Sequence, residues 1–244
     1  MNLIKNQPLH VGLIIDGNGR WATKKGKDRL YGHKHGLEKI IYETVNWASE
    51  FQIKYLTLYV FSTENWKRSQ HEIDGLFNLI REYADEILRV ALENNVKVLF
   101  LGDLTKLPED VQKTLLNIYD QTQNCSNFTL SIAINYGARD EICRAVNNIL
   151  KSGKTEINQQ TFESFLYTAA IPDPDLIIRT GGEKRLSNFL LYQSAYTELY
   201  FTKTFWPAFT KKHFKKAIKN YSKRDRRYGG DHTKKQEKKW KLEL

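Results

Sequence analysis

Six short stretches, several of them almost continuously apolar, constrain the fold of this chain more than any other feature of its sequence. They are rich in β-branched and aromatic residues and are bounded by polar or turn residues, which is typical of β-strands. Strands that are apolar on both faces are expected in a parallel sheet that is covered on both sides. The six predicted strands are His10–Asp16, Tyr55–Phe61, Val96–Gly102, Phe128–Asn135, Asp175–Thr180 and Glu198–Thr202.

Segments with helical periodicity separate these strands. The clearest repeats apolar residues every three or four positions from Ile73 to Ala91, over about six turns. Weaker patterns predict helices at Leu37–Glu50, Pro108–Thr122, Arg139–Leu150 and Thr161–Ala169. Strands that alternate with helices predict an α/β fold with a central, mostly parallel, six-stranded sheet flanked by helices. A length of 244 residues suits one such domain.

Basic residues concentrate at the C-terminal end. The net charge is +10, yet residues 203–244 alone contain fifteen Lys and Arg against four Asp and Glu, a net of +11. After Tyr228-Gly229-Gly230 the sequence is rich in Lys and poor in apolar residues. We therefore expect a folded domain over residues 1–230 and a basic tail over residues 231–244. Such a tail can meet RNA, anionic lipid headgroups or only water.

Compartment and redox state follow from what the sequence contains. Its apolar stretches are far too short to span a bilayer, and residues 1–8 lack the apolar region of a secretory signal, which predicts a cytoplasmic protein. Cys125 and Cys143 belong to no CxxC motif and no His cluster. We interpret both as structural thiols rather than as a disulfide or a zinc site.

The first predicted strand leads into a loop suited to binding an anion, Asp16-Gly17-Asn18-Gly19-Arg20-Trp21. Ligands of open α/β sheets bind beyond the carboxyl ends of the strands. Gly17 and Gly19 allow backbone N–H groups to converge on a phosphate, and Asp16 offers an oxygen ligand for Mg²⁺. A DGNG sequence by itself is more often only a tight turn, so the hypothesis depends on other residues.

Three further groups of residues support it. Arg29 and His33 are four residues apart, a spacing that places both on one face if the segment is helical. The second strand ends in Phe61–Arg68, where hydroxyl, amide and cationic groups surround two aromatic residues. The fifth strand leads into Arg179–Asn188, whose Arg, Ser and Gly residues predict a second anion-binding loop. Two such loops imply two phosphorylated substrates.

Glu198, at the start of the last predicted strand, is a further carboxylate. We expect it near the same edge of the sheet as Asp16, where it would share the metal. Other common motifs are missing: GxxxxGK[ST], GxGxxG, GxSxG and HExxH do not occur. A P-loop, a nicotinamide-binding loop and the corresponding hydrolase sites are therefore disfavoured.

The motifs, taken in order, resemble those of the cis-prenyltransferases, most closely the bacterial undecaprenyl diphosphate synthases. The resemblance runs from His10 to Gly230 through HVGLIIDGNGRWA, GHKHG, LTLYVFSTENWKR, INYG, LIIRTGGEKRLSNFLLYQ, AYTELYFT and RRYGG. It departs at Ser69, where the family usually has Pro, and at Tyr192, where it usually has Trp. The DDxxD motifs of the synthases that form trans double bonds are absent.

This resemblance implies an enzyme that condenses isopentenyl diphosphate onto an allylic diphosphate such as farnesyl diphosphate and creates cis double bonds. Its product would be a long polyprenyl diphosphate, with undecaprenyl diphosphate for the cell-wall lipid carrier as the expectation. The resemblance also implies Mg²⁺ as cofactor, a homodimer, a catalytic domain over residues 1–230 and a hydrophobic product tunnel beside the helix Glu72–Asn95. Peripheral contact with the inner face of the membrane is a further expectation.

Residue roles follow from the same resemblance. Asp16 would bind Mg²⁺ and be essential, and Glu198 of the partner subunit would add a metal ligand. Asn65 matches the proton acceptor, although a neutral amide is a poor base and alternatively orients water or diphosphate. Glu72 would support the loop that closes over the site. The expected substrate-binding residues are Gly17, Asn18, Gly19, Arg20, Trp21, Arg29, His33, Ser62, Thr63, Glu64, Trp66, Arg68, Arg179, Arg185, Leu186 and Ser187.

Two other hypotheses belong to different classes. The first is a non-catalytic partner subunit that keeps the fold, but known partners of that kind lack several motif residues that are intact in this chain. The second is a nucleic-acid binder that uses the basic tail. Since the motifs already point to diphosphate substrates, nucleic acid is not expected as a partner.

Overall fold

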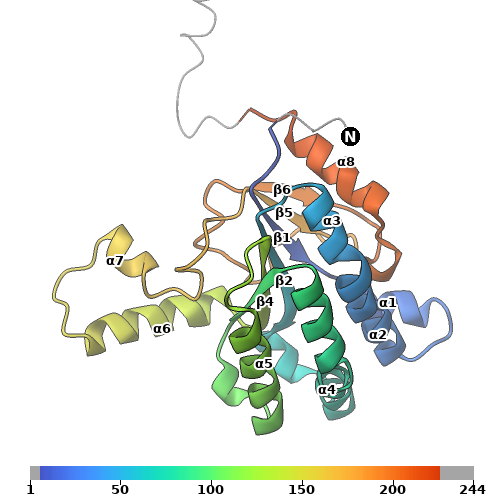
Figure 1. Cartoon of the computed structure of the whole chain (residues 1–244), viewed down its shortest axis with the longest axis horizontal. Helices are drawn as coiled ribbons and strands as arrows, with labels where there is room; N and C mark the ends of the chain where they lie inside the picture. The colour runs from blue at the N-terminus through green and yellow to red at the C-terminus, as the bar shows by residue number, and fades with distance from the viewer. Residues whose placement is uncertain (1–5, 226–244) are drawn as a thin grey trace, which may run out of the picture.

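A six-stranded sheet forms the centre of the molecule, which is described over residues 6–225 by a computed structural model (Figure 1). The strand order is β3-β4-β2-β1-β5-β6, and every neighbouring pair is parallel. The predicted α/β class and parallel sheet are therefore confirmed. The strands are β1 His10–Ile14, β2 Tyr55–Ser62, β3 Val96–Leu101, β4 Phe128–Tyr136, β5 Leu176–Arg179 and β6 Glu198–Phe201.

All six strands begin and end within two residues of the predicted bounds. The helices agree less closely with their predicted bounds. The RRYGG block and the predicted tail over residues 231–244 lie outside the described residues. The helices are α1 Asn18–Thr23, α2 Arg29–Lys39, η1 Ile40–Thr44, α3 Val45–Glu50, η2 Thr63–Lys67, α4 Gln70–Glu93, η3 Leu104–Lys106, α5 Glu109–Thr122, α6 Ala138–Lys151, α7 Gln159–Glu163, η4 Trp206–Ala208 and α8 Lys211–Tyr221.

Two helix predictions need correction. The helix expected at Thr161–Ala169 is the short α7, and turns follow it from residue 164. The helix expected at Leu37–Glu50 begins eight residues earlier, at Arg29, where the side chain of Asp28 caps the N–H of Leu30. It continues through a π-helical turn, η1, into α3.

The early start of α2 was missed because its glycines disfavour a helix when only local propensity is considered. In the folded chain they allow α2 to lie directly against α1. A Cβ atom on Gly32 would fall 2.0 Å from the backbone oxygen of Asn18, and one on Gly36 would fall 2.6 Å from the Oδ1 atom of Asn18. Gly32 therefore cannot be replaced without moving the backbone of α1, and a side chain at Gly36 would displace that of Asn18.

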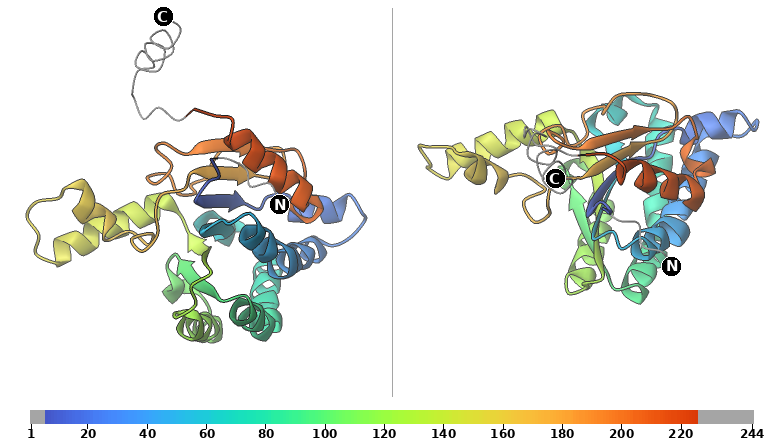
Figure 2. Two further views of the ribbon diagram at one scale, coloured as in Figure 1. Left: turned by 45° about the horizontal axis from the view of Figure 1, so that its top comes forward. Right: turned by 90° about the horizontal axis from the view of Figure 1, so that it is seen from above.

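The two faces of the sheet have different covers (Figure 2). On one face, apolar residues of the strands pack against α3, α4, α5 and α8. The other face packs against the start of α6 and against the segments 167–171 and 186–190. The rest of α6, with α7, projects from the body of the molecule as an arm (Figure 1). No helix within residues 6–225 combines the length and apolar character that a membrane span needs.

Candidate functional site

A pocket of about 270 Å³ opens at the carboxyl ends of the central strands. Ile14, the last residue of β1, pairs with Tyr59 of β2 and with Arg179 of β5, so the loops that follow these three strands meet. The pocket wall contains thirteen of the predicted site residues, which are Asp16, Gly17, Asn18, Gly19, Arg20, Arg29, His33, Ser62, Asn65, Arg68, Arg179, Arg185 and Ser187.

One side of the pocket, the first cradle, is formed by the loop from Asp16 and the first turns of α1 and α2. Gly17 has φ 107°, and a Cβ atom there would fall 2.5 Å from the ring of Phe205. A Cβ atom on Gly19 would fall 2.6 Å from the guanidinium carbon of Arg29. The glycines thus bring backbone and guanidinium together, and the first N–H groups of a helix are free to bind an anion.

Glu72, in the first turn of α4, joins the cations of the first cradle. Its carboxylate accepts hydrogen bonds from Arg29 Nε at 3.0 Å, from His33 Nε2 at 3.1 Å and from Arg68 Nη1 at 2.9 Å. Its side chain is only 10% exposed. The hydrogen bond from His33, followed by those from the arginines, lowers the pKa of Glu72 to about 2 against the effect of burial. Glu72 therefore stays ionised and orders three donors around the pocket.

Asp16 lies between two guanidinium groups. One carboxylate oxygen is 3.0 Å from Arg20 Nη2, and the other is 3.0 Å from Arg179 Nη2. Within residues 6–225, no cluster of three or more His, Cys, Asp or Glu side chains is arranged to hold a metal. A single carboxylate beside a pocket suited to anions fits Mg²⁺, which is often bound by one carboxylate together with phosphate oxygens.

The opposite side of the pocket, the second cradle, is formed by Arg179 and the loop that follows β5. Arg179 is 4% exposed, and its Nη1 atom donates to the Ser187 hydroxyl at 2.7 Å and to the backbone oxygen of Arg185. Its buried Nε atom has no partner among the described residues. The guanidinium of Arg185 is exposed and pairs with Glu183 at 2.6 Å. The second cradle thus contains one buried guanidinium, that of Arg179, and one exposed guanidinium, that of Arg185.

Asn65 lies in the loop after β2. Its Oδ1 atom accepts a hydrogen bond from the backbone N–H of Ser62 at 3.1 Å. Because an N–H group can only donate, the oxygen of the amide must face Ser62 and the amide NH₂ remains for other partners. This geometry favours Asn65 as a hydrogen-bond donor over Asn65 as a proton acceptor.

Three predicted substrate-binding residues with apolar side chains lie outside the pocket wall. Trp21 stacks on Tyr31, with ring centroids 5.9 Å apart. Trp66 donates from Nε1 to Asn135 Oδ1 at 2.8 Å. Leu186 packs on the sheet. Trp66 is nevertheless 37% exposed and the other two are half-buried, so their role in substrate binding stays a prediction.

Thr63 and Glu64 are also absent from the pocket wall. The Thr63 hydroxyl donates to Asp140 Oδ2 at 3.0 Å, and Glu64 Oε1 accepts from Asn188 Nδ2 at 2.9 Å. Both residues therefore hold the β2 loop against neighbouring loops.

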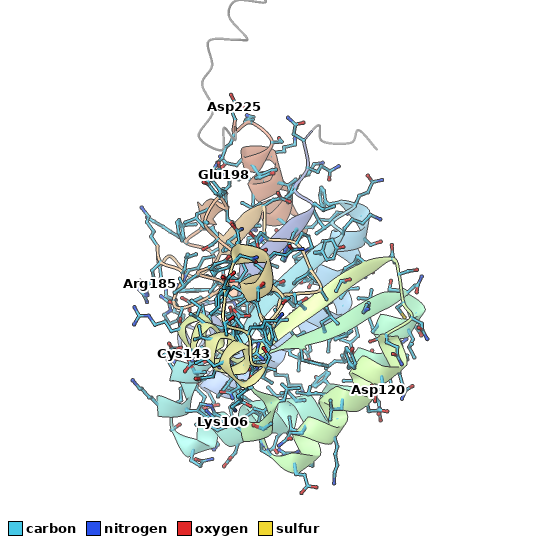
Figure 3. The ribbon with its side chains drawn as sticks, turned by 90° about the vertical axis from the view of Figure 1, so that its left-hand side faces the viewer. Lys106, Asp120, Cys143, Arg185, Glu198 and Asp225 are labelled. Carbon is cyan, nitrogen blue, oxygen red and sulfur yellow. The ribbon has the colours of Figure 1, made fainter. Side chains whose placement is uncertain are left out.

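Glu198 lies at the other end of the sheet from Asp16. It opens β6 and pairs with Leu176, which pairs with Val11 near the start of β1. At about 3.3 Å per residue, Asp16 is roughly 16 Å further along. The expectation that both carboxylates share one edge is wrong, because in a parallel sheet the first residues of all strands lie together. Glu198 pairs instead with Arg224, and Figure 3 shows it well apart from Arg185.

Two apolar cavities of about 60 Å³ each extend from the pocket between the sheet and helices α2 and α4. One cavity shares four wall residues with the pocket: Ile15, Asn18, His33 and Val60. The second cavity adjoins the first, and the two share the wall residues Leu37, Ile40, Val60, Ile80 and Ile134. The pocket and the two apolar cavities are therefore neighbours in the space between the sheet and these helices.

The sequence did not identify every residue of the pocket. Ile14, Ile15, Tyr59 and Val60 also line it. In the sequence they belong to apolar strands, and an apolar residue at the end of a strand looks the same whether it faces the core or a ligand.

Comparison with known proteins adds an independent finding. A family model described as "Putative undecaprenyl diphosphate synthase" matches residues 14–229. An isoprenyl transferase of Thermotoga maritima is 50% identical over 91% of this chain and 97% of its own length, and one of Fusobacterium nucleatum is 45% identical over 93% and 97%.

Two solved structures are also similar. Lavandulyl diphosphate synthase from Lavandula x intermedia, in complex with dimethylallyl diphosphate, has a TM-score of 0.86 and 31% identity over 91% of this chain and 98% of that chain. A probable undecaprenyl diphosphate synthase from Campylobacter jejuni has a TM-score of 0.76 and 36% identity over 92% and 99%.

Proposed function

The chain belongs to the cis-prenyltransferase family, and from that premise we propose that it condenses isopentenyl diphosphate onto farnesyl diphosphate to make a long-chain polyprenyl diphosphate. The observation that carries the proposal is one pocket with two separate sets of basic side chains. Arg29, His33 and Arg68 lie on one side, and Arg179 and Arg185 lie on the other. A site for two diphosphates has this arrangement.

The first cradle would bind the allylic diphosphate. As the bond from the allylic carbon to diphosphate breaks, positive charge develops on carbon and negative charge on the departing oxygens. Arg29, His33, Arg68 and the first-turn N–H groups of α1 would stabilise those oxygens. Glu72 holds the three side chains in place before the substrate arrives, which reduces the reorganisation that the reaction requires.

The second cradle would bind isopentenyl diphosphate. Arg179 and Ser187 form its buried part, and Arg185 forms its exposed part. The double bond of this substrate would attack the allylic carbon, and loss of a proton would then create the new double bond. We propose that the NH₂ group of Asn65 orients a water molecule or a diphosphate oxygen in this step, since its own oxygen is engaged by Ser62.

Asp16 would hold Mg²⁺ together with diphosphate oxygens. When bound, the ion would supply positive charge to neutralise the leaving diphosphate. Asp16 also accepts from Arg20 and Arg179, so the same carboxylate positions a guanidinium of the second cradle. A homodimer would add Glu198 of the partner subunit as a further metal ligand.

The apolar cavities support a tunnel for the growing chain. They lie beneath Val60 and Ile15 at the floor of the pocket and extend beside α4. An elongating prenyl chain that buries its methylene groups there would gain about 0.8 kcal/mol for each. We propose undecaprenyl diphosphate as the product, a catalytic domain over residues 1–230 and peripheral contact with the membrane through the basic tail.

The deciding experiment combines the full chain with Mg²⁺, farnesyl diphosphate and radiolabelled isopentenyl diphosphate. We expect labelled polyprenyl diphosphates that can be resolved by chain length, and the length distribution would test the undecaprenyl assignment. Absence of any elongated product under these conditions would refute the proposed function.

A further inference from the structure

Asn188, in the loop after β5, forms hydrogen bonds with two other segments of the chain. Its backbone oxygen accepts from Ala138 N at 2.8 Å, and its Oδ1 atom accepts from Arg139 N at 3.0 Å, so it caps the start of α6. Its Nδ2 atom donates to Glu64 Oε1 at 2.9 Å. One side chain therefore connects the loops that follow β5, β4 and β2.

The backbone around Asn188 is held in an uncommon conformation. Ser187, Asn188 and Leu190 have φ of 49°, 64° and 45°. Left-handed backbone is unfavourable for residues with a side chain, and Asn tolerates it better than most. Such a conformation persists when surrounding contacts impose it, and it is frequent at functional sites. In this loop the conformation directs the Ser187 hydroxyl towards Arg179.

The packing at Gly137 shows how closely the three loops meet. A Cβ atom on Gly137 would fall 2.6 Å from Thr63 Oγ1, 2.6 Å from Asp140 Oδ2 and 2.7 Å from Asn188 Nδ2. The β2 loop, the start of α6 and the β5 loop thus close on one glycine. A shift of the Asn188 side chain would consequently be felt in the β2 loop as well as in its own.

We propose that Asn188 is a positioning residue that fixes the second cradle relative to the Ser62–Arg68 loop. The inference rests on the proposed function, because it assigns the second cradle to isopentenyl diphosphate. Asn188 does not line the pocket. It acts through Ser187, which precedes it and accepts from Arg179, and through Glu64, which adjoins Asn65.

Of the hydrogen bonds made by the Asn188 side chain, the one to Glu64 is the stronger. Burial would raise the pKa of Glu64, but hydrogen bonds from its own backbone N–H and from Asn188 lower it, so the carboxylate is ionised. Hydrogen bonds to ionised groups are roughly twice as strong as neutral ones. Arg68 of the first cradle lies at the end of the same loop, but Glu72 also holds it. Losing the Asn188 contact should therefore affect isopentenyl diphosphate more than the allylic substrate.

The test compares Asn188→Ala with Asn188→Gly. Both variants lose the side-chain hydrogen bonds, but Gly adopts a left-handed φ without strain. We expect both to raise KM for isopentenyl diphosphate about tenfold, the equivalent of one or two hydrogen bonds, and to change KM for farnesyl diphosphate less than threefold. Wild-type kinetics in Asn188→Gly would show that only the backbone matters and would overturn the proposal.

A rescue experiment uses the bond to Glu64. Asn188→Asp places a second carboxylate beside that of Glu64. In the double variant with Glu64→Gln, the amide of Gln donates to the carboxylate of Asp, so the hydrogen bond is restored with donor and acceptor exchanged. We expect the double variant to have a lower KM for isopentenyl diphosphate than Asn188→Asp alone. Equal values would contradict a role through Glu64.

Asn95 provides a matched control at the opposite end of the sheet. It also has a left-handed φ, 53°, and its Oδ1 atom accepts from the backbone N–H of Ser126 at 3.1 Å. Asn95→Ala should lower the melting temperature as much as Asn188→Ala while both KM values stay unchanged. Inactive wild-type protein would refute the proposed function itself. Active wild-type protein with an unchanged KM in Asn188→Ala would refute only the positioning role.

Discussion

The two cradles of the pocket bind the same chemical group by different means. The first combines a loop of six residues and the start of a helix with three basic side chains, which the single carboxylate of Glu72 holds together. The second depends on a buried arginine and a loop whose left-handed backbone is fixed by residues from other strands. The first cradle should therefore depend on one charge, and the second on the conformation of its loop.

Removal of Asp16 should have the largest effect, because its carboxylate lies between the cradles and contacts Arg20 and Arg179. We expect Asp16→Ala to reduce kcat by at least about 10²–10³-fold, as for the loss of one charge-stabilising group. The fold should be retained, since the residue follows β1, but the melting temperature should fall because the buried Arg179 loses its counter-charge. Steady-state kinetics and thermal melting would measure both.

Asp110 is the matched control for that variant. It pairs with Arg81 on the surface of α5 and α4, away from the pocket. Asp110→Ala should keep wild-type kcat. If Asp16→Ala were as active as this control, Asp16 would have no part in the reaction.

Glu72→Gln should have the next largest effect, and it should affect the first cradle. With the counter-charge gone, Arg29, His33 and Arg68 lose their common acceptor. We expect KM for farnesyl diphosphate to rise about tenfold, which corresponds to about 1.4 kcal/mol, with a smaller change for isopentenyl diphosphate. An equal rise for both substrates would mean that the cradles are not separate.

The pKa of Glu72 adds a test of stability. Its folded-state pKa of about 2 lies below the ordinary 4.5, so it contributes stability that is fully present above about pH 4.5 and is lost as the pH falls towards 2. The difference in melting temperature between wild type and Glu72→Gln should therefore be large at pH 6 and smaller at pH 3. A constant difference would contradict the assigned ionisation.

Ser187→Ala should have a smaller effect, restricted to the second cradle. It removes the acceptor for Arg179 Nη1 but leaves the backbone in place. We expect KM for isopentenyl diphosphate to rise about fivefold, the equivalent of one hydrogen bond, with KM for farnesyl diphosphate unchanged. Ser194→Ala, whose hydroxyl donates only to its own turn at Leu191, serves as the control. A change in the farnesyl diphosphate KM would show that the cradles communicate.

His10 should have the smallest effect on catalysis, because it lies at the start of β1, away from both cradles. It is buried between Pro172 O at 2.6 Å and Thr57 Oγ1 at 2.8 Å, and burial lowers its pKa to about 4. Its contribution to stability is therefore present above about pH 6.5 and is lost as the pH falls from 6.5 to 4.

His10→Gln should remove the part of the pH dependence of melting that lies between pH 6.5 and 4, with both KM values unchanged at pH 7.5. An unaltered pH profile in the variant would show that His10 does not titrate in this window. A changed KM would show that the amino end of β1 influences the pocket.

The sequence predicted those parts of the molecule that depend on neighbouring residues. Apolar runs located all six strands, and the order of strands and helices predicted a parallel sheet. The parallel sheet, in turn, indicated that the residues after β1, β2 and β5 would meet. That reasoning brought Asp16, Asn65 and Arg179 to one pocket without any structure.

Other features depended on packing between distant segments. Local propensity disfavours a helix at the glycines of α2, and only the contact with α1 shows why glycine is needed there. Trp21 and Trp66 follow residues of the pocket in sequence, and only the structure shows that Trp21 stacks on Tyr31 and that Trp66 donates to Asn135. Glu198 looked like a partner for Asp16 because both are carboxylates beside strands, and only the register placed them at opposite ends of the sheet.

The sequence by itself thus determined the sheet, the family resemblance and the chemical types of the residues at the site. Tertiary structure alone decided that Glu72 joins the cations of the first cradle and that Asn188 connects the second cradle to Glu64. The physical reason is range. Strand patterns and glycine turns act over a few residues, whereas these carboxylates and amides bind partners 39 to 124 residues away, where the sequence gives no measure of distance.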